Sequence, residues 1–292
     1  MSSGAIPDPS APLTPSGNLR RRQIFSKATE YGATTAAILA IVVLGIVVYT
    51  VVARGAKALN LDFVFTAAPT GIGPELLGTG VIVLVATAIA MPLGVLIALF
   101  LTEYAGNRAA GPIRHTLDLM NGLPSIIIGL FIFGLLVDHK QQSGLAAAVA
   151  LAIIELPLIA RGSQEILLLV PNSMREAADA LGVARWRSVL GVILPSALGG
   201  IVTSTVLAVA RAAGETAPLI FASSVFDASR FSINPLEALP NVPVTIYTLS
   251  EEGNPEGFTQ AWGLSLLLVS LILLASLGAR ALLARSKRKM AS

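Results

Sequence analysis

The chain has 292 residues, of which 54% are hydrophobic and only 13% are charged, and its mean hydropathy is +0.77. A soluble globular chain carries roughly 25% charged residues, so this composition excludes an ordinary soluble domain and indicates a membrane-embedded protein. The formal net charge of +3 is too small to indicate a nucleic-acid partner. Because the chain has no cysteine and only two histidines, we expect no disulfide framework, thiol nucleophile or metal site.

The first thirty residues are rich in proline and serine and then become basic. We expect residues 1–30 to form a disordered cytoplasmic arm. They do not read as a cleaved signal peptide, because the apolar run that follows is too long for the apolar core of one.

Six stretches meet or approach the length of about 20 apolar residues that a helix needs to cross the hydrocarbon layer of a membrane. In chain order they are 33–53, 76–101, 119–137, 144–160, 189–210 (continuing past Arg211) and 261–279. The sequence therefore predicts an all-α, polytopic membrane protein with six transmembrane helices. Its transmembrane domain is expected over residues 31–285, followed by a basic cytoplasmic tail at 286–292.

Lysine and arginine indicate which side of the membrane each connecting segment faces, because they are enriched on the cytoplasmic side. With the N-terminus inside, fifteen of the twenty basic residues fall in cytoplasmic segments and four in external ones, and Arg211 lies within a span. We therefore predict that both termini are cytoplasmic. The long segment 161–187 is then cytoplasmic, and the proline-containing segment 218–260 is an external, ordered loop or a set of short re-entrant pieces.

The cytoplasmic segment contains signals for a short helix. Ser173 and Glu176 have the spacing of a capping box, which begins a helix, and Gly182 suits the left-handed conformation that ends one. On cap chemistry alone, this helix is equally well a simple interfacial connection between two spans.

The residues of this segment also resemble the coupling loop of ABC importer permeases. The resemblance is carried by Glu176-Ala177-Ala178, Gly182 after three further residues, and a Val-Ile-Leu-Pro sequence at 192–195, where the family usually has Ile in place of Val192. It implies the type I ABC importer permease fold, with a cytoplasmic coupling loop at about 171–195 whose short helix docks into a groove on a cytoplasmic ATPase. The residues implied in ATPase coupling are Glu176, Ala177, Ala178, Gly182, Arg175 and Arg185.

Three further stretches resemble the permeases of phosphate importers, and the resemblance covers roughly residues 30–285. They are NGLPSIIIGLF (121–131), RAAGETAPL (211–219) and LPNVPVTIY (239–247). Residues 214–219 are similar to the PstA-type subunit and not to its PstC-type partner. The resemblance implies a pathway for inorganic phosphate with the candidate residues Arg211, Glu215, Arg161, Ser125 and Thr216.

The residue chemistry at 211–215 is independently suited to an anion. An ionisable residue within a span is costly and suggests function, and the planar fork of an arginine matches two phosphate oxygens. Arg211 and Glu215 are four apart and share a helix face, so Glu215 could hold Arg211 when phosphate is absent. The alternative is a structural ion pair that locks this span to a partner subunit.

The other polar positions also leave alternatives open. Arg161 is expected to pair with Glu165, and it serves either transport or an interface with lipid headgroups. Ser125 follows Pro124 at a break that offers hydroxyl and backbone N–H groups to an anion, although a proline kink needed only for packing is equally plausible. We expect Glu155 to be structural.

The chain contains no G-x-x-x-x-G-K-[ST] sequence, so we expect it not to be an enzyme and to carry no cofactor. The resemblance implies that ATP and Mg are bound by two copies of a partner ATPase subunit. It also implies a heterodimer with a PstC-type permease, an extracellular phosphate-binding protein, and the lipid bilayer of a bacterial cell membrane. Alternatives are an ABC permease for sulfate or molybdate, a secondary transporter or channel, and a structural membrane subunit of a respiratory complex.

Overall fold

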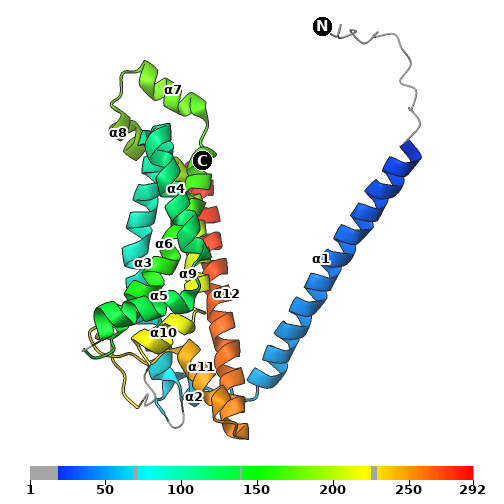
Figure 1. Ribbon diagram of the computed structural model, residues 1–292, viewed down its shortest axis with the longest axis vertical. Coiled ribbons are helices and arrows are strands. Elements are labelled where there is room, and N and C mark those ends of the chain that lie inside the picture. Colours follow the sequence, from blue (N-terminus) through cyan, green and yellow to red (C-terminus); the bar gives the residue numbers. More distant parts are fainter. Residues whose placement is uncertain (1–18, 69–70, 139, 225–228, 292) are drawn as a thin grey trace. The chain divides into compact units, whose positions relative to one another are not determined.

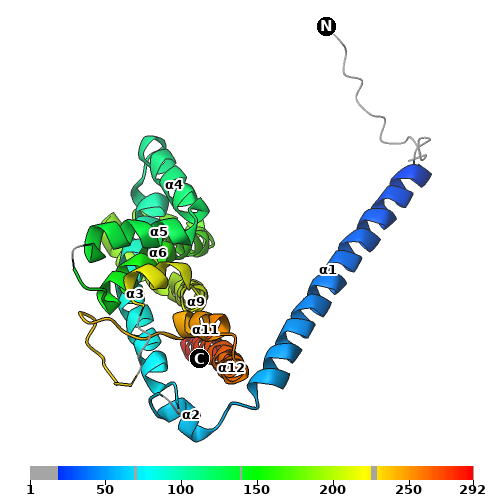
Figure 2. The ribbon, with the colours of Figure 1, turned by 60° about the horizontal axis from the view of Figure 1, so that its bottom comes forward.

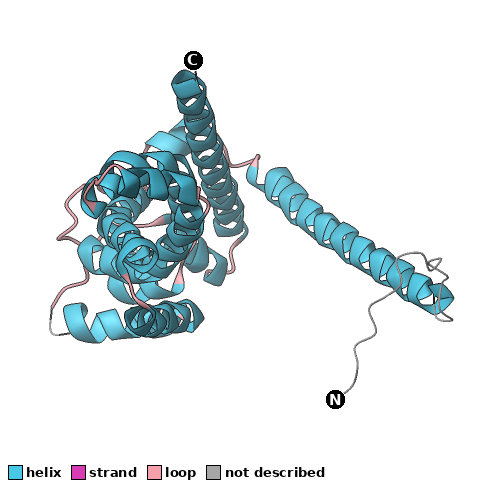
Figure 3. Ribbon diagram, turned by 90° about the horizontal axis from the view of Figure 1, so that it is seen from above, coloured by secondary structure: helices cyan, strands magenta, loops and turns pink. Residues whose placement is uncertain are grey.

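The structure is a computed structural model that describes residues 19–68, 71–138, 140–224 and 229–291. Within these residues every regular element is a helix (Figure 3), which confirms the all-α prediction. The chain divides into two compact units, residues 1–50 and residues 51–292.

The first helix, α1 (Leu19–Gly55), makes up the described part of the first unit and continues into the second. Its stretch Arg21–Gly55 is long and apolar enough to span a membrane. The predicted disordered arm differs from the structure over residues 19–30, which form the first turns of α1. This part of the sequence contains three arginines together with leucine, glutamine, lysine, alanine and glutamate, all of which favour helices. The rest of the predicted arm lies outside the described residues.

The second unit contains short helices, long helices and three π-helical turns, labelled η. Its elements in chain order are α2 (Leu61–Phe65), α3 (Gly73–Leu99), η1 (Phe100–Tyr104), α4 (Asn107–Gly122), α5 (Ser125–Ile132), η2 (Phe133–Val137), α6 (Gly144–Leu168), α7 (Asn172–Ala180), α8 (Arg185–Ser188), η3 (Val189–Ile193), α9 (Leu194–Ala212), α10 (Ala217–Ala222), α11 (Val242–Glu251) and α12 (Pro255–Ala291).

Four segments of the second unit are long and apolar enough to cross a membrane without a break. They are Gly73–Tyr104, Gly144–Leu168, Arg185–Ala212 and Pro255–Gly278. The first three contain the predicted spans 76–101, 144–160 and 189–210, and the fourth covers the predicted span 261–279 except for its last residue. Each is longer than the prediction, because polar residues extend the helices beyond their apolar stretches. The predicted continuation of the fifth span past Arg211 is confirmed, since α9 ends at Ala212.

The third span was predicted as one stretch over 119–137 and is instead two helices. Arg108–Gly122 and Ser125–Val137 meet at an angle of 96°, and Figure 2 shows α4 and α5 turning sharply at this break. Pro124 explains the break, because proline lacks a backbone N–H and disfavours helical geometry at the residue before it. Leu123 is accordingly extended, with a ψ angle of 130°.

Helix α6 lies at the centre of the second unit, between α3 and α9 (Figure 1). Among the 18 most apolar consecutive residues of α6, 67% are buried, compared with 17% for the corresponding stretch of α12. Its buried face is made largely of alanines, which allow neighbouring helices to approach closely. At Gly94 in α3, an added Cβ would lie 2.9 Å from the Cγ2 of Ile159 in α6, so the α3–α6 contact requires a residue without a side chain.

The two ends of the second unit differ in structure. Helices α7 and α8 lie at one end, together with the C-terminal end of α12, whereas α2, α10 and α11 lie at the other (Figure 1). The predicted ordered segment 218–260 is confirmed, because it contains α10, α11 and the start of α12.

Buried hydrogen bonds fix the LPNVPVTIY stretch to its neighbours at this second end. Asn241 caps α11 by accepting from the N–H of Val244 at 3.1 Å, and its side-chain amide donates to the carbonyl of Ser223 at 2.8 Å. The N–H of Val242 donates to the hydroxyl of Thr79 in α3 at 2.9 Å. The stretch is therefore explained by the packing of this end of the fold.

The α3–α6 contact gives a testable prediction about stability. Gly94→Val should lower the free energy of unfolding by about 1–3 kcal/mol, because the larger side chain overpacks the contact with Ile159. The measurement is the thermal or denaturant unfolding of the purified chain in detergent. Gly80→Val on the same helix is the matched control, because no atom lies within 4 Å of a Cβ added there. Equal losses in the two variants would contradict the close approach.

Candidate functional site

The break between α4 and α5 forms one wall of a cavity of about 200 Å³. The C-terminal end of α9 and the residues that follow it contribute Arg211 and Glu215, and α6 contributes apolar side chains. The polar lining residues are Asn121, Ser125, Arg211 and Glu215. Three of the five predicted pathway residues therefore meet in one cavity, although they come from segments about ninety positions apart in the chain.

The Arg211–Glu215 pair in this cavity is loose. The Nε of Arg211 lies 3.7 Å from Oε1 of Glu215, which is longer than a hydrogen bond. The arginine side chain is 61% exposed and the glutamate side chain 18% exposed. Within the described residues Glu215 is the one partner of the Arg211 side chain. The guanidinium therefore keeps its terminal N–H groups free for another acceptor.

Ser125 and Asn121 lie on the two sides of the helix break. Asn121 is in the last turn of α4, and Ser125 is the first residue of α5, after the extended residues Leu123 and Pro124. The N-terminus of a helix carries unpaired N–H groups and a partial positive charge. The break therefore adds a hydroxyl, an amide and a helix N-terminus to the lining of the cavity that contains Arg211.

Thr216 and Arg161 do not line this cavity. Thr216 lies at the N-terminal boundary of the short helix α10. Arg161 pairs with Asp118 of α4 and also donates to the carbonyl of Arg114 at 3.0 Å. The predicted Arg161–Glu165 pair is wrong: Glu165 is exposed on α6, and the guanidinium turns instead to the neighbouring helix. Spacing within one helix did not reveal this longer-range partner.

Glu155 is fully buried in α6 and does not line the cavity. The hydroxyl of Thr87 in α3 donates to its Oε2 at 3.1 Å. This contact ties α3 to α6 next to their closely packed faces and supports the structural interpretation of Glu155.

The expected short helix of the 161–187 segment is present as α7, but its start differs from the prediction. Pro171 is the residue before the helix and no side chain caps it, so the capping box of Ser173 and Glu176 is wrong. The fixed φ of Pro171 and the extended backbone there begin the helix two residues earlier, at Asn172.

The predicted end of α7 is confirmed at Gly182. Its φ is +67°, in the left-handed region that favours glycine. The N–H of Gly182 donates to the carbonyl of Asp179 at 3.0 Å, and that of Val183 donates to the carbonyl of Ala178 at 3.0 Å. These two bonds form a Schellman motif, which stops α7 and turns the chain toward α8.

Helix α7 has an exposed face and an inner face. Glu176 and Ala177 are exposed, whereas Ala178 is 7% exposed and Arg175 is partly buried. The sequence treated these four residues as one coupling surface. The structure separates them, because residues three apart lie on the same side of a helix and Arg175 and Ala178 both face this chain.

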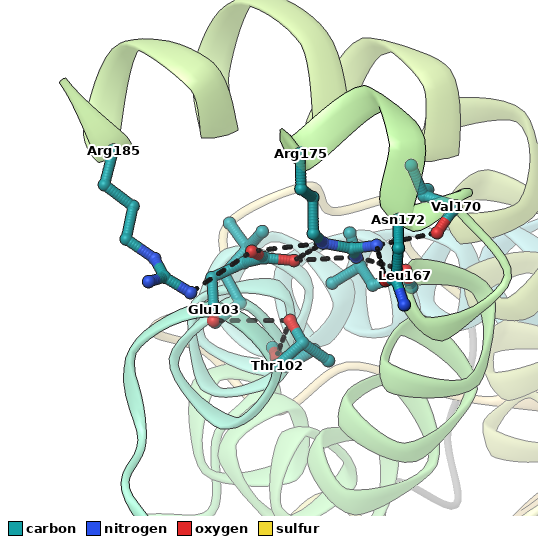
Figure 4. A network of polar contacts seen from close by, with 9 residues as sticks. Thr102, Glu103, Leu167, Val170, Asn172, Arg175 and Arg185 are labelled. Carbon is teal, nitrogen blue, oxygen red and sulfur yellow. Dashed lines mark hydrogen bonds and ion pairs between the residues drawn. The ribbon is translucent and has the colours of Figure 1, made fainter. Parts of the chain in front are cut away.

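Arg175 and Arg185 approach a carboxylate that the sequence analysis did not single out, that of Glu103 in η1 (Figure 4). The Nη2 of Arg175 lies 2.9 Å from Oε1 of Glu103, and the Nη2 of Arg185 lies 3.9 Å from Oε2. The signal that could have pointed to it is an acidic residue two positions beyond the predicted span 76–101, at its cytoplasmic boundary.

The chain is similar in sequence to known proteins. Residues 90–291 match the family model of the binding-protein-dependent transport system inner membrane component. The chain is 36% identical to "Phosphate transport system permease protein PstA 1" of Mycobacterium tuberculosis, with 92% of this chain and 90% of that protein covered. It is 33% identical to "Phosphate transport system permease protein PstA" of Xylella fastidiosa, with 92% of this chain and 96% of that protein covered.

The fold is also that of a solved ABC importer. A chain of a bacterial alginate ABC transporter, crystallised with an alginate-bound periplasmic protein, superposes with a TM-score of 0.64 at 12% identity. The match covers 90% of this chain and 96% of that chain. Together with the apolar spans, these matches show that the chain is a multi-pass membrane protein that belongs to the family of binding-protein-dependent transport system inner membrane components.

Proposed function

We propose that this chain is the permease subunit through which an ATP-driven importer moves inorganic phosphate into a bacterial cell. The observation that carries the proposal is Arg211, a guanidinium with free N–H groups in a cavity at the break of a membrane span. An arginine fork binds two oxygens of one phosphate. The names of the relatives, which are phosphate transport permeases, point to the same substrate.

The site suggests how phosphate binds and leaves. Arg211 takes the anion, while Ser125 and the N-terminus of α5 approach it from the wall that the helix break forms. Glu215 lies close enough to pair with Arg211 once the phosphate has gone, and its negative charge weakens the hold of the arginine on the anion. A weaker hold favours transport, because a substrate that binds too tightly does not leave.

The exposed face of α7 suggests how ATP drives the cycle. Glu176 and Ala177 dock on a cytoplasmic ATPase subunit, present in two copies, which binds ATP and Mg. A PstC-type permease completes the pore, and an extracellular phosphate-binding protein delivers the substrate. The basic residues near α7 and the C-terminus support a cytoplasmic location for this end of the chain and for both termini. Alternating access follows from movement between two packed states.

The first test is phosphate uptake by the assembled transporter in vesicles. Arg211→Ala should lower uptake at limiting phosphate roughly tenfold to a hundredfold, because a hydrogen bond to a charged group contributes about 1.5–3 kcal/mol. Arg211→Lys keeps the charge but not the fork and should recover part of the loss.

The controls for this test separate the substrate from the site. Arg22→Ala removes an exposed arginine of α1 and should leave uptake unchanged. Normal uptake by Arg211→Ala would show that Arg211 is structural. Uptake of sulfate or molybdate in place of phosphate by the wild type would contradict the substrate but not the permease.

The role of Glu215 has its own prediction. Glu215→Gln removes the negative charge beside Arg211, so phosphate should bind more tightly and leave more slowly. The expected result is a lower half-saturating phosphate concentration together with a lower maximal rate of uptake. A higher half-saturating concentration would instead mean that Glu215 orients Arg211 toward the substrate.

The exposed face of α7 gives a prediction about assembly. Glu176→Lys should reduce the amount of ATPase subunit that co-purifies with this chain, because it reverses a charge in the proposed docking surface. Glu165→Lys reverses an exposed charge on α6 and is the matched control. Equal recovery of the ATPase with both variants would contradict the assignment of this face.

A further inference from the structure

Glu103 is a buried carboxylate in η1, directly after α3, and lies 72 positions before Arg175 of α7 in the chain. Its side chain is 2% exposed. Arg175 donates to it from Nη2 to Oε1 at 2.9 Å, from Nε to Oε1 at 3.2 Å and from Nε to Oε2 at 3.4 Å. A buried charge is retained only where it is paired and hydrogen-bonded, so this contact fixes the two side chains to each other.

Arg175 holds α6 as well as α3. Its Nη2 also donates to the carbonyl of Leu167 at 3.0 Å, and its Nη1 donates to the carbonyl of Val170 at 2.6 Å (Figure 4). The carbonyl of Leu167 lies in the last turn of α6, where helix carbonyls carry partial negative charge, and Val170 follows the end of the helix. One guanidinium on α7 therefore joins the ends of two membrane-spanning helices.

Arg185 provides a second, weaker contact with the same carboxylate. Its Nη2 is 3.9 Å from Oε2 of Glu103, and its guanidinium carbon is 5.9 Å from the centre of the Tyr104 ring. The side chain is 62% exposed. Since α7 ends at Gly182 and α8 begins at Arg185, η1 receives one contact from each side of the turn.

The rest of α7 is poorly attached to the permease. Within the described part of the chain, every side-chain hydrogen bond from α7 to another helix is made by Arg175. Ala178 is the one buried residue of α7. Loss of the Arg175–Glu103 contact would therefore leave the bonds of Arg175 to the carbonyls of Leu167 and Val170 in place, but no side-chain hydrogen bond from α7 to the α3–η1 span.

The helix end that carries Glu103 is itself unusual. Residues Phe100–Tyr104 form a π-helical turn, closed by the bond from the N–H of Ala105 to the carbonyl of Phe100 at 2.7 Å. A second π-helical turn, η3, precedes α9 and packs against α7 and α8. Such turns are rare and frequently lie at functional sites. Two of the three described here lie at the end of the fold that holds α7.

We propose that the Glu103–Arg175 ion pair is the link through which movement of α7 reaches α3 and α6, and that Glu103 is the positioning residue of this link. The proposal rests on the proposed function, in which α7 docks on the ATPase. When the ATPase moves α7, Arg175 carries the ends of both spans with it. Without the pair, α7 follows the ATPase but α3 does not.

The test compares three variants in the assembled, vesicle-reconstituted transporter. Glu103→Gln keeps the shape of the side chain and removes its charge. Glu103→Asp restores the charge on a shorter side chain, and Arg175→Lys keeps the charge but cannot bond the carboxylate and both carbonyls together. Glu30→Gln on α1 is the matched control, because it removes an exposed carboxylate.

The measured quantity is phosphate taken up per ATP hydrolysed. Glu103→Gln and Arg175→Lys should lower this ratio about tenfold, while ATP hydrolysis continues, since residues that couple two sites alter the coupling by this order. Glu103→Asp should recover part of the ratio, and Glu30→Gln should keep it. A merely stabilising role would reduce the amount of assembled complex without changing the ratio, and that result would overturn the proposal.

A distance measurement tests the link without relying on the substrate. The chain has no cysteine, so Leu181→Cys in the turn after α7 and Leu96→Cys in α3 accept a pair of spin labels, in a complex whose other subunits lack reactive cysteines. In the otherwise unchanged chain, ATP binding should leave the label distance constant, because the two segments move together. In Glu103→Gln the distance should change on ATP binding.

The two readouts separate the two proposals. A label distance that stays constant in Glu103→Gln overturns the link, whatever the transported substrate is. A wild-type complex that shows the expected label behaviour but takes up no phosphate overturns the proposed substrate and supports the link. Should Glu103→Gln fail to assemble, Glu103→Asp and Arg175→Lys give the same comparison with the charge retained.

Discussion

The structure depends on how its charged side chains are paired beside a hydrocarbon environment, where an unpaired charge is costly. Three of the arginine–carboxylate pairs, those of Arg175, Arg161 and Arg211, differ in closeness and exposure. Arg175 holds Glu103 through several bonds, and that carboxylate is 2% exposed. Arg161 holds Asp118 of a neighbouring helix. Arg211 is 3.7 Å from Glu215 and is largely exposed. The two tight pairs join helices, whereas the loose pair lies in the cavity and leaves donors free for a ligand.

Helix α6 connects the cavity with the end of the fold that holds α7 and α8. Ile154 and Leu158 line the cavity, Arg161 ties α6 to α4, and the carbonyl of Leu167 accepts a hydrogen bond from α7. The close packing of α6 against α3 and α9 makes it a rigid element. A displacement at one end is therefore carried to the other as a movement of the whole helix, and no separate chain of side chains is required.

The sequence predicted features that depend on composition or on local spacing. Apolar stretches located the membrane-spanning segments, and Gly182 was recognised as a helix end because only glycine adopts a φ of +67° readily. Arg211 and Glu215 were predicted to share one helix face, and this is wrong: α9 ends at Ala212, so Glu215 approaches Arg211 from the segment that follows the helix. The angle between α4 and α5 at Pro124 was not predictable. Proline predicts a break, but the size of the angle is set by the packing of α4 and α5 on α6. The capping box failed because Pro171 already begins the helix.

The residues that sequence spacing missed are those whose partners lie far away in the chain. Glu103 and Arg175 are separated by 72 positions, and Arg161 and Asp118 by 43. The same limitation applies to the Glu-Ala-Ala sequence of α7, which reads as a single docking surface. In three dimensions Glu176 and Ala177 are exposed, while Ala178 faces inward beside Arg175. A helix that transmits movement needs one face that contacts the partner and another that is attached to its own chain. Force from a partner on one side reaches the spans only through a firm attachment on the other.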